Sequence, residues 1–227
     1  MAPNVAPGKT RVSRGTPSPS ARARPLLIGV AGYKGGVTKT TTAVHVAGAL
    51  QAHGTPTLLV DGDRIRTATD WAQLGHLDFE VGSPQALARA GEFGAVVIDS
   101  RGGLEQNELL ELAESVDFLL LPTQADLVNL RGISKTIAGL RSAGIPDTKF
   151  GVLLTRVKPT RLASAREALQ ELGLPLLDAS VRNSDAFQDA GNQGMLVRDV
   201  RRNRLSPECW SDYEAVTAEV LGRVGRA

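Results

Sequence analysis

The strongest structural signal in this chain is the stretch Gly32-Tyr33-Lys34-Gly35-Gly36-Val37-Thr38-Lys39-Thr40-Thr41-Thr42. It follows the apolar run 26–31, which has the composition of a buried strand, and precedes the segment 43–50, whose apolar spacing is typical of a helix. Glycines let a backbone come close to a phosphate, and the N-terminus of a helix favours an anion. The order of strand, glycine loop and helix therefore predicts a phosphate-binding site.

The stretch follows the P-loop pattern G-x-x-x-x-G-K-[ST] with one departure. Lys39 is the lysine that would reach the β- and γ-phosphates of ATP, and the Thr40 hydroxyl would ligate Mg²⁺. Thr38 stands where the pattern has the glycine before the lysine, a change that would strain the loop or narrow the phosphate cradle. The alternative to a P-loop is a plain glycine turn. The predicted nucleotide-binding residues are Lys34, Gly35, Gly36, Val37, Thr38, Lys39, Thr40 and Thr41.

Length and composition indicate one soluble domain. The chain has 227 residues, enough for a single α/β domain with its own core, and no apolar run approaches the roughly 20 residues of a membrane-spanning helix. The single Cys209 excludes an internal disulfide framework, fits a reducing compartment and argues against an iron–sulfur cluster. The three histidines show no metal-ligand spacing.

The charge is distributed unevenly along the chain. Residues 1–25 hold five of the 26 basic residues and no acidic residue, which leaves 21 basic against 24 acidic residues in the rest. Residues 1–25 also lack large apolar side chains and the apolar core of a secretory signal, so we predict a disordered basic arm. This arm would hold DNA phosphates weakly or would be only a solvated extension. Residues 26–227 are predicted to form the single domain.

Beyond the P-loop, short apolar runs alternate with segments of helical periodicity, which favours a doubly wound α/β fold with a mostly parallel twisted sheet and helices on both faces. The predicted strands are 57–61, 79–81, 95–99, 117–122, 149–157 and 174–181. The predicted helices are 39–53, 66–74, 104–115, 126–144, 161–172 and 206–226.

Two of the predicted strands end in aspartates. Asp61 and Asp63 stand at the end of one strand, and Asp99 ends another. Ligands of open α/β sheets bind outside the carboxyl ends of the strands, so these side chains are expected in the nucleotide crevice. Asp99 fits the role of a carboxylate that accepts hydrogen bonds from Mg²⁺-bound water. An aspartate after a strand can also merely cap a turn.

Lys34 extends the motif to K-G-G-x-x-K-[ST], which resembles the deviant Walker A box of the ParA/MinD superfamily of ATPases, here in the short ParA-type form. The resemblance covers nearly all of residues 26–222. It implies a homodimer in the ATP state in which Lys34 reaches the phosphates of the partner; the alternative is a solvated loop cation. It also implies that Asp63 orients the attacking water, so the predicted catalytic residues are Lys34, Lys39 and Asp63.

The resemblance also assigns roles to later residues. Arg182 is a candidate contact to the base. The arginines that follow are either a surface for DNA without sequence preference or only a solvated run of charge: Arg198, Arg201, Arg202 and Arg204. Asp126 either caps a helix or lines the dimer face. Arg101 either contacts a phosphate or a partner, or is solvated.

The implied function is a partition ATPase of the cytoplasm and nucleoid, which segregates a plasmid or chromosome together with a ParB-like centromere-binding protein. ATP and Mg²⁺ are the implied cofactors, and hydrolysis is expected to be slow without the partner. One rival is a MinD-like membrane ATPase, for which the bland segment 222–227 is a poor anchor. Another is a nucleotide-locked scaffold without turnover.

Overall fold

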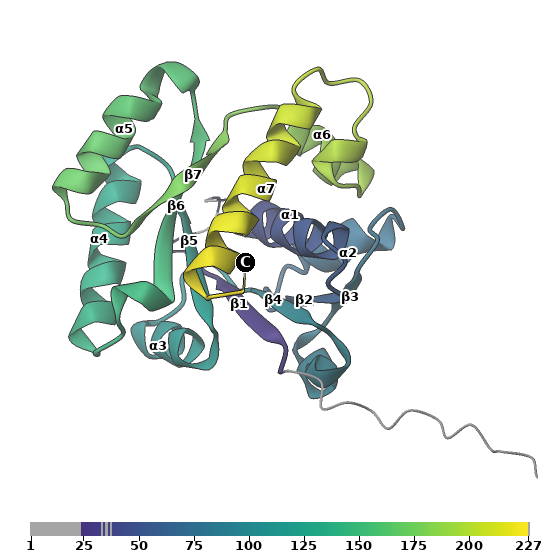
Figure 1. The fold of residues 1–227 in the computed structure, drawn as a ribbon, viewed down its shortest axis with the longest axis horizontal. Coiled ribbons are helices and arrows are strands. Elements are labelled where there is room, and N and C mark those ends of the chain that lie inside the picture. The colour runs from purple at the N-terminus through teal and green to yellow at the C-terminus, as the bar shows by residue number, and fades with distance from the viewer. Residues whose placement is uncertain (1–23, 33, 35, 37, 227) are drawn as a thin grey trace, which may run out of the picture.

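The computed structural model describes residues 24–32, 34, 36 and 38–226, and of Leu127 only the backbone. Among these residues, seven strands form one sheet in the order β3-β2-β4-β1-β5-β6-β7, and every pairing in it is parallel. The predicted doubly wound α/β fold is confirmed (Figure 1). The strands are β1 (Leu26–Val30), β2 (Thr57–Asp61), β3 (Glu80–Gly82), β4 (Ala95–Asp99), β5 (Phe118–Thr123), β6 (Phe150–Val157) and β7 (Leu176–Arg182).

Helices cover both faces of the sheet. One face carries α1 (Lys39–Ala52), α2 (Thr67–Gln73), α6 (Ala186–Gln193) and α7 (Ser206–Arg223). The other carries α3 (Gln106–Ser115), α4 (Leu127–Ser142) and α5 (Pro159–Glu171). The chain leaves β1 toward one face and the adjacent strand β4 toward the other, and a crevice opens at such a point beyond the strand ends.

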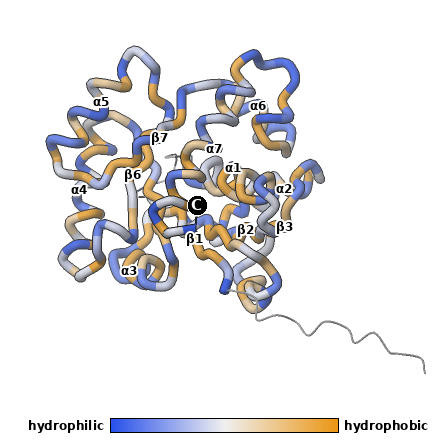
Figure 2. The backbone as a smooth tube through the Cα atoms, in the orientation of Figure 1, coloured by the Kyte–Doolittle hydropathy of each residue, from blue (hydrophilic) through white to orange (hydrophobic). Residues whose placement is uncertain are grey.

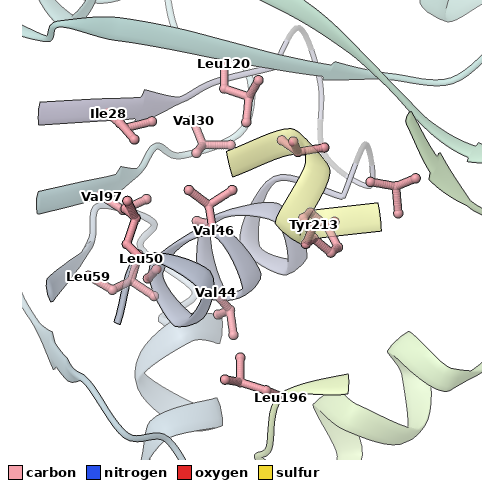
Figure 3. Packing of buried hydrophobic residues seen from close by; sticks show 14 of the residues in the cluster. Ile28, Val30, Val44, Val46, Leu50, Leu59, Val97, Leu120, Leu196 and Tyr213 are labelled. Carbon is pink, nitrogen blue, oxygen red and sulfur yellow. The ribbon is translucent and has the colours of Figure 1, made fainter. Parts of the chain in front are cut away.

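Helix α1 is the centre of the larger core. Its residues 42–50 are all buried, because α7 covers the side that faces away from the sheet. Figure 3 shows Val46 and Leu50 close to strand side chains such as Val97, with Tyr213 of α7 and Leu196 around the helix. Hydrophobic residues concentrate along β1 and β2 in the middle of the molecule (Figure 2). This packing holds the first turn of α1, which begins at Lys39, in a fixed position.

Four helical segments of the described chain are absent from the sequence-based prediction, two of them the three-residue 3₁₀ segments η2 (Asp147–Lys149) and η3 (Val197–Asp199). Residues Pro84–Glu92 form the 3₁₀ segment η1, which buries none of its residues completely and so lacks the buried apolar face by which a helix is recognised in a sequence. Helix α6 lies within the late block 180–197. It is only eight residues long, and its two buried residues are the small Ala186 and Ala190. A segment this short and polar carries too few apolar residues for its helical period to be recognised.

The start of the described chain is anchored to the domain. Arg24 forms a bidentate pair with Asp117, at 2.5 and 3.1 Å, and Asp117 also accepts the N–H of Leu27 at 2.9 Å. The predicted basic arm, up to residue 23, lies outside the described residues. Within the described residues, no helix has the length and the apolar character needed to cross a membrane.

Candidate functional site

The loop between β1 and α1 lies at the carboxyl edge of the sheet, where Lys39 begins α1. Lys39 is 6% exposed, and its Nζ lies 3.4 Å from the backbone carbonyl oxygen of Lys34. The ammonium group therefore lies over the loop instead of extending into solvent, where it can contact a phosphate that the loop holds. Two residues of the predicted site, Gly35 and Val37, lie outside the described residues.

Thr38 adopts the left-handed backbone conformation that glycine would take at low cost. Its φ is 66° and its ψ is 21°. This region costs a residue with a Cβ atom about 1–2 kcal/mol. The Thr38 hydroxyl donates a hydrogen bond to Oγ1 of Thr155, near the end of β6, at 3.0 Å. The departure from the P-loop pattern therefore strains the backbone at Thr38, one of the two outcomes expected from the sequence, and also connects the loop to a neighbouring strand.

Strand register brings two of the aspartates together beside the P-loop. Asp61 and Asp99 are register partners, and Asp99 also pairs with Val30, the last residue of β1. The N–H of Gly62 donates to the backbone carbonyl oxygen of Asp99 at 2.8 Å, and a Cβ atom on Gly62 would come within 2.8 Å of the same oxygen. Glycine at this position therefore permits the close approach of the two strand ends.

Asp61 and Asp63 have different surroundings. Asp61 is 1% exposed, and its Oδ2 accepts hydrogen bonds from the backbone N–H and the hydroxyl of Thr69, at 2.8 and 2.7 Å. Asp63 is partly exposed, and its Oδ1 accepts the N–H of Ile65 at 3.1 Å within a turn. Asp61 therefore holds the first turn of α2, whereas the carboxylate of Asp63 is accessible to a water molecule in the crevice.

Asp99 has the surroundings expected of a residue that holds Mg²⁺-bound water. It is completely buried, and neither carboxylate oxygen makes a hydrogen bond within the described residues. Burial raises the pKa of Asp99 to about 7, although nearby Thr40 and Lys39 act in the opposite direction. A buried carboxylate without a partner is unfavourable unless a cation or ordered water satisfies it. The donor set fits Mg²⁺, with Thr40 as a ligand and Asp99 acting through water.

Two neighbouring loops show what Arg101 and Asp126 contact. The Arg101 guanidinium pairs with Glu108 and donates to the carbonyl oxygen of Gly103 at 3.0 Å, so it closes its own loop. Asp126 accepts the N–H of Asn129 at 3.0 Å and caps α4, so the capping alternative is confirmed. A contact of Asp126 with a second subunit stays a prediction.

A pocket of about 490 Å³ extends from the P-loop between α2, α6 and the ends of β6 and β7. Its lining combines hydroxyl, aromatic and amide side chains, which suits a nucleoside. These include Thr38, Thr41, Trp71, Arg156, Asn183 and Phe187. The backbone of Arg156 is left-handed, with φ of 51°, at an irregular stretch of the β6–β7 pairing. The end of β6 therefore bends where it forms part of the pocket wall.

Arg182, the predicted contact to the base, also lines this pocket. Its guanidinium donates to both carboxylate oxygens of Asp212, at 2.7 and 2.8 Å, and its N–H donates to the same carboxylate at 3.0 Å. The charge of Arg182 is therefore paired with α7. A contact to the base stays a prediction, and it would come from a side chain that is already fixed in place.

The late arginines fall into two groups. Arg198 pairs with Asp78 at 2.7 Å, and its guanidinium lies 4.8 Å from the ring centre of Trp210. Arg198 thus fastens the segment to the domain, with its side chain 28% exposed. The others of the predicted set are exposed: Arg201, Arg202 and Arg204.

His45 is a buried polar residue behind the site whose role the sequence did not reveal. It is completely buried in α1, its Nδ1 lies 2.7 Å from the carbonyl oxygen of Thr41, and its Nε2 accepts the N–H of Val197 at 3.1 Å. A carbonyl only accepts, so the proton is on Nδ1 and the ring is neutral. The ring stacks on Tyr213, with 4.8 Å between the ring centres. His45 thus links the first turn of α1 to the start of the arginine segment.

We expect His45 to reduce stability in mildly acidic solution. Burial lowers its pKa from 6.5 to about 4, so below pH 6.5 the unfolded chain takes up a proton that the folded chain does not. The stability advantage of the wild type over His45→Gln should therefore shrink by about 2 kcal/mol between about pH 7.5 and about pH 5. Urea unfolding of both proteins measures this, and parallel pH profiles would contradict it. Asp99, whose pKa is raised, changes stability with pH in the opposite direction. Its contribution is the same in both proteins and cancels when the free energy of unfolding of one is subtracted from that of the other.

The fold and this arrangement define a nucleotide-binding protein of the P-loop class. The family model of the CobQ/CobB/MinD/ParA nucleotide binding domain matches residues 28–197, and the chain belongs to this family. The resemblance to the ParA/MinD superfamily is therefore confirmed.

Two named relatives and one solved structure show which members of the family this chain resembles. The chain is 34% identical over 208 residues to the maintenance of carboxysome distribution protein A of Gloeobacter kilaueensis, an alignment that covers 86% of this chain and 94% of that protein. It is 27% identical over 188 residues to the protein of the same name from Halothiobacillus neapolitanus, covering 76% and 86%. A solved structure of a variant of Cyanothece McdA in complex with ATP has the same fold, with a TM-score of 0.61, 19% identity and coverage of 90% and 98%.

Proposed function

We propose that this chain is a ParA-type positioning ATPase. It binds ATP with Mg²⁺, forms a homodimer in that state, binds DNA without sequence preference, and hydrolyses ATP to return to the monomer. Three findings support the proposal: membership of the CobQ/CobB/MinD/ParA family, two relatives named for the distribution of a cellular structure, and the site described above.

The proposed cargo follows the names of these relatives. Both are named for carboxysome distribution, whereas the ParA resemblance alone implies a plasmid or chromosome. We therefore propose that the chain distributes a protein assembly of the carboxysome kind, in the cytoplasm and along the nucleoid. A cargo-bound partner protein takes the place of a ParB-like centromere-binding protein and stimulates hydrolysis.

The chemistry needs four residues of this chain and one from its partner. Lys39 neutralises the charge of the phosphates of the ATP that its own chain binds. The partner's Lys34 would contact the same phosphates from the other side of the dimer interface. Asp63 accepts a hydrogen bond from the attacking water and so directs it at the γ-phosphate. Thr40, and Asp99 through water, would hold Mg²⁺, which would supply further neutralisation of the charge that develops on the leaving ADP.

The observation that supports the enzymatic part of the proposal is the state of Asp99. Its two carboxylate oxygens are buried and make no hydrogen bond within the described part of the chain, and Asp99 is in register with Asp61 beside the loop of Lys39.

Exposed residues at the same carboxyl edge of the sheet support the dimer. Lys34 is exposed and borders a hollow of about 380 Å³ between the P-loop and α4. Ile65 and Val128 are large apolar residues that are 77% and 61% exposed. Exposed apolar residues beside charged groups are typical of interaction surfaces.

Phosphate release by the full chain tests the enzymatic function. We expect slow release that requires Mg²⁺, stops with EDTA and rises when DNA and the cargo partner are added. A chain that binds ATP but releases no phosphate under any of these conditions would favour the nucleotide-locked scaffold. A chain that fails to bind ATP with Mg²⁺ would contradict the proposal altogether.

DNA binding should depend on the exposed arginines of the late segment. The variant with Arg201→Ala and Arg202→Ala removes four positive charges from a dimer. Each lost phosphate contact should lower the slope of log affinity against log salt concentration by about 0.9, or about 3.6 for four contacts. Filter binding of random-sequence DNA with ATP, over a range of salt concentrations, measures this slope.

The matched control removes the same charge elsewhere. Lys158 and Arg161 are exposed at the start of α5, and their replacement by alanine should leave the slope unchanged. Equal slopes for the wild type and the Arg201/Arg202 variant would show that DNA, if bound, is held by another surface.

A further inference from the structure

The P-loop is fastened to the neighbouring strands by side chains that the P-loop pattern does not include. The Thr38 hydroxyl donates to Oγ1 of Thr155, and Thr155 in turn donates to the carbonyl oxygen of Thr123, each at 3.0 Å. Thr155 is 1% exposed and Thr123 is 2% exposed. A hydroxyl has one proton to donate, so Thr155 can only accept from Thr38, and the direction of the chain of hydrogen bonds is determined.

A second contact fastens the same loop nearby. Nε2 of Gln124, the residue after β5, donates to the carbonyl oxygen of Gly36 at 3.2 Å. The ends of β5 and β6 therefore hold the loop at two points, one on each side of Val37. The hydrogen bond of Thr38 also offsets part of the cost of its left-handed backbone.

Thr155 belongs to the wall of the nucleoside pocket as well. Both Thr38 and Thr155 line the pocket, and Arg156, which follows Thr155, has the strained backbone that shapes the wall. The bond between the two hydroxyls is therefore a direct connection between the part of the site that holds phosphates and the part that holds the nucleoside.

We propose that Thr38 is a positioning residue for the nucleotide, which sets the phosphate loop and the nucleoside pocket at a fixed separation before the nucleotide arrives. This inference rests on the proposed nucleotide-binding function. A site that is already ordered loses less conformational entropy on binding, so the bond increases affinity without taking part in the reaction. Because the bond touches no γ-phosphate group, it serves ATP and ADP equally.

Two isosteric variants test the bond. Thr38→Val and Thr155→Val each keep the branched shape and remove a hydroxyl. Thr38→Val should weaken the binding of both ATP and ADP about fivefold, the effect of losing one net hydrogen bond. Thr155→Val should weaken it at least as much, because it also loses the hydrogen bond to the carbonyl oxygen of Thr123. The variant with both changes should bind no more weakly than Thr155→Val alone, because the bond between the two hydroxyls is lost only once. Thr38→Ser keeps the hydroxyl and should bind within about twofold of the wild type.

Calorimetric titration with ATP and with ADP measures these affinities, and thermal unfolding of the nucleotide-free proteins shows whether each variant is folded. Additive losses in the cycle, or a Thr38→Val protein that binds like the wild type, would overturn the inference. If Thr155→Val does not fold, the pair Thr38→Val and Thr38→Ser decides. Failure of the wild type to bind any nucleotide would instead refute the proposed function.

Discussion

The variant Asp63→Asn should bind ATP and dimerise like the wild type while releasing phosphate at least about 100-fold more slowly, since a positioned proton acceptor contributes 10²–10⁴-fold. Asp63 lies two residues beyond the end of β2 and is partly exposed, and only one of its oxygens is used in the turn with Ile65. An amide keeps the shape of the turn but cannot accept the proton of the attacking water. Single-turnover phosphate release, with ATP binding measured separately, resolves the two effects.

Asp61→Asn is the matched control for this prediction. Asp61 receives the hydrogen bonds of Thr69 and of the N–H of Asp63, so its replacement should lower the free energy of unfolding by about 1–2 kcal/mol, as the loss of a helix cap does. Turnover of the folded Asp61→Asn protein should stay close to that of the wild type. If Asp63→Asn hydrolyses ATP at the wild-type rate, Asp63 does not direct the water.

The variant Lys34→Ala should lose ATP-dependent dimerisation, with a dissociation constant for the dimer at least about 100-fold higher. Removing Lys34 would leave the phosphates of the ATP bound to the partner without their positive counter-charge across the interface. Lys34 is exposed, so it is accessible to a second subunit. Binding of ATP to the monomer should change little, because Lys39 of the same chain still holds the phosphates. DNA retention with ATP, compared with ADP, reports the dimer.

Lys135→Ala is the control for Lys34→Ala. Lys135 is an exposed lysine on α4, and its loss removes the same charge without touching the phosphate loop. If Lys34→Ala retains as much DNA with ATP as Lys135→Ala does, Lys34 is a solvated loop residue and has no part in the mechanism.

The sequence predicted the fold and the acidic crevice because both depend on local patterns. Each buried strand is a short apolar run, and the last residues of these runs are necessarily at one edge of a parallel sheet. Asp61 and Asp99 could therefore be placed together without knowing their exact register, which the structure then supplied. The P-loop is also local, because one strand, one loop and one helix form it.

The remaining features of the site depend on contacts between residues that are far apart in the chain. Thr38 and Thr155 are 117 positions apart, and His45 and Val197 are 152 apart. These pairs form only when β6 and the segment before α7 are packed against α1. Arg198 was grouped with the exposed arginines because its partner Asp78 is 120 positions away. Local sequence patterns carry no information about such pairs. Neither the hydrogen bonds that connect the P-loop to β5 and β6 nor the burial of His45 could therefore be predicted.

The central claim is that ATP joins two copies of this chain, and molecular mass in solution tests it most directly. Sedimentation of the 24.0 kDa wild-type chain should give twice this mass with Mg²⁺ and a non-hydrolysable ATP analogue, and the single-chain mass with ADP. Lys34→Ala should stay at the single-chain mass with both nucleotides. A wild-type chain that binds the analogue and sediments at 24.0 kDa would contradict the account.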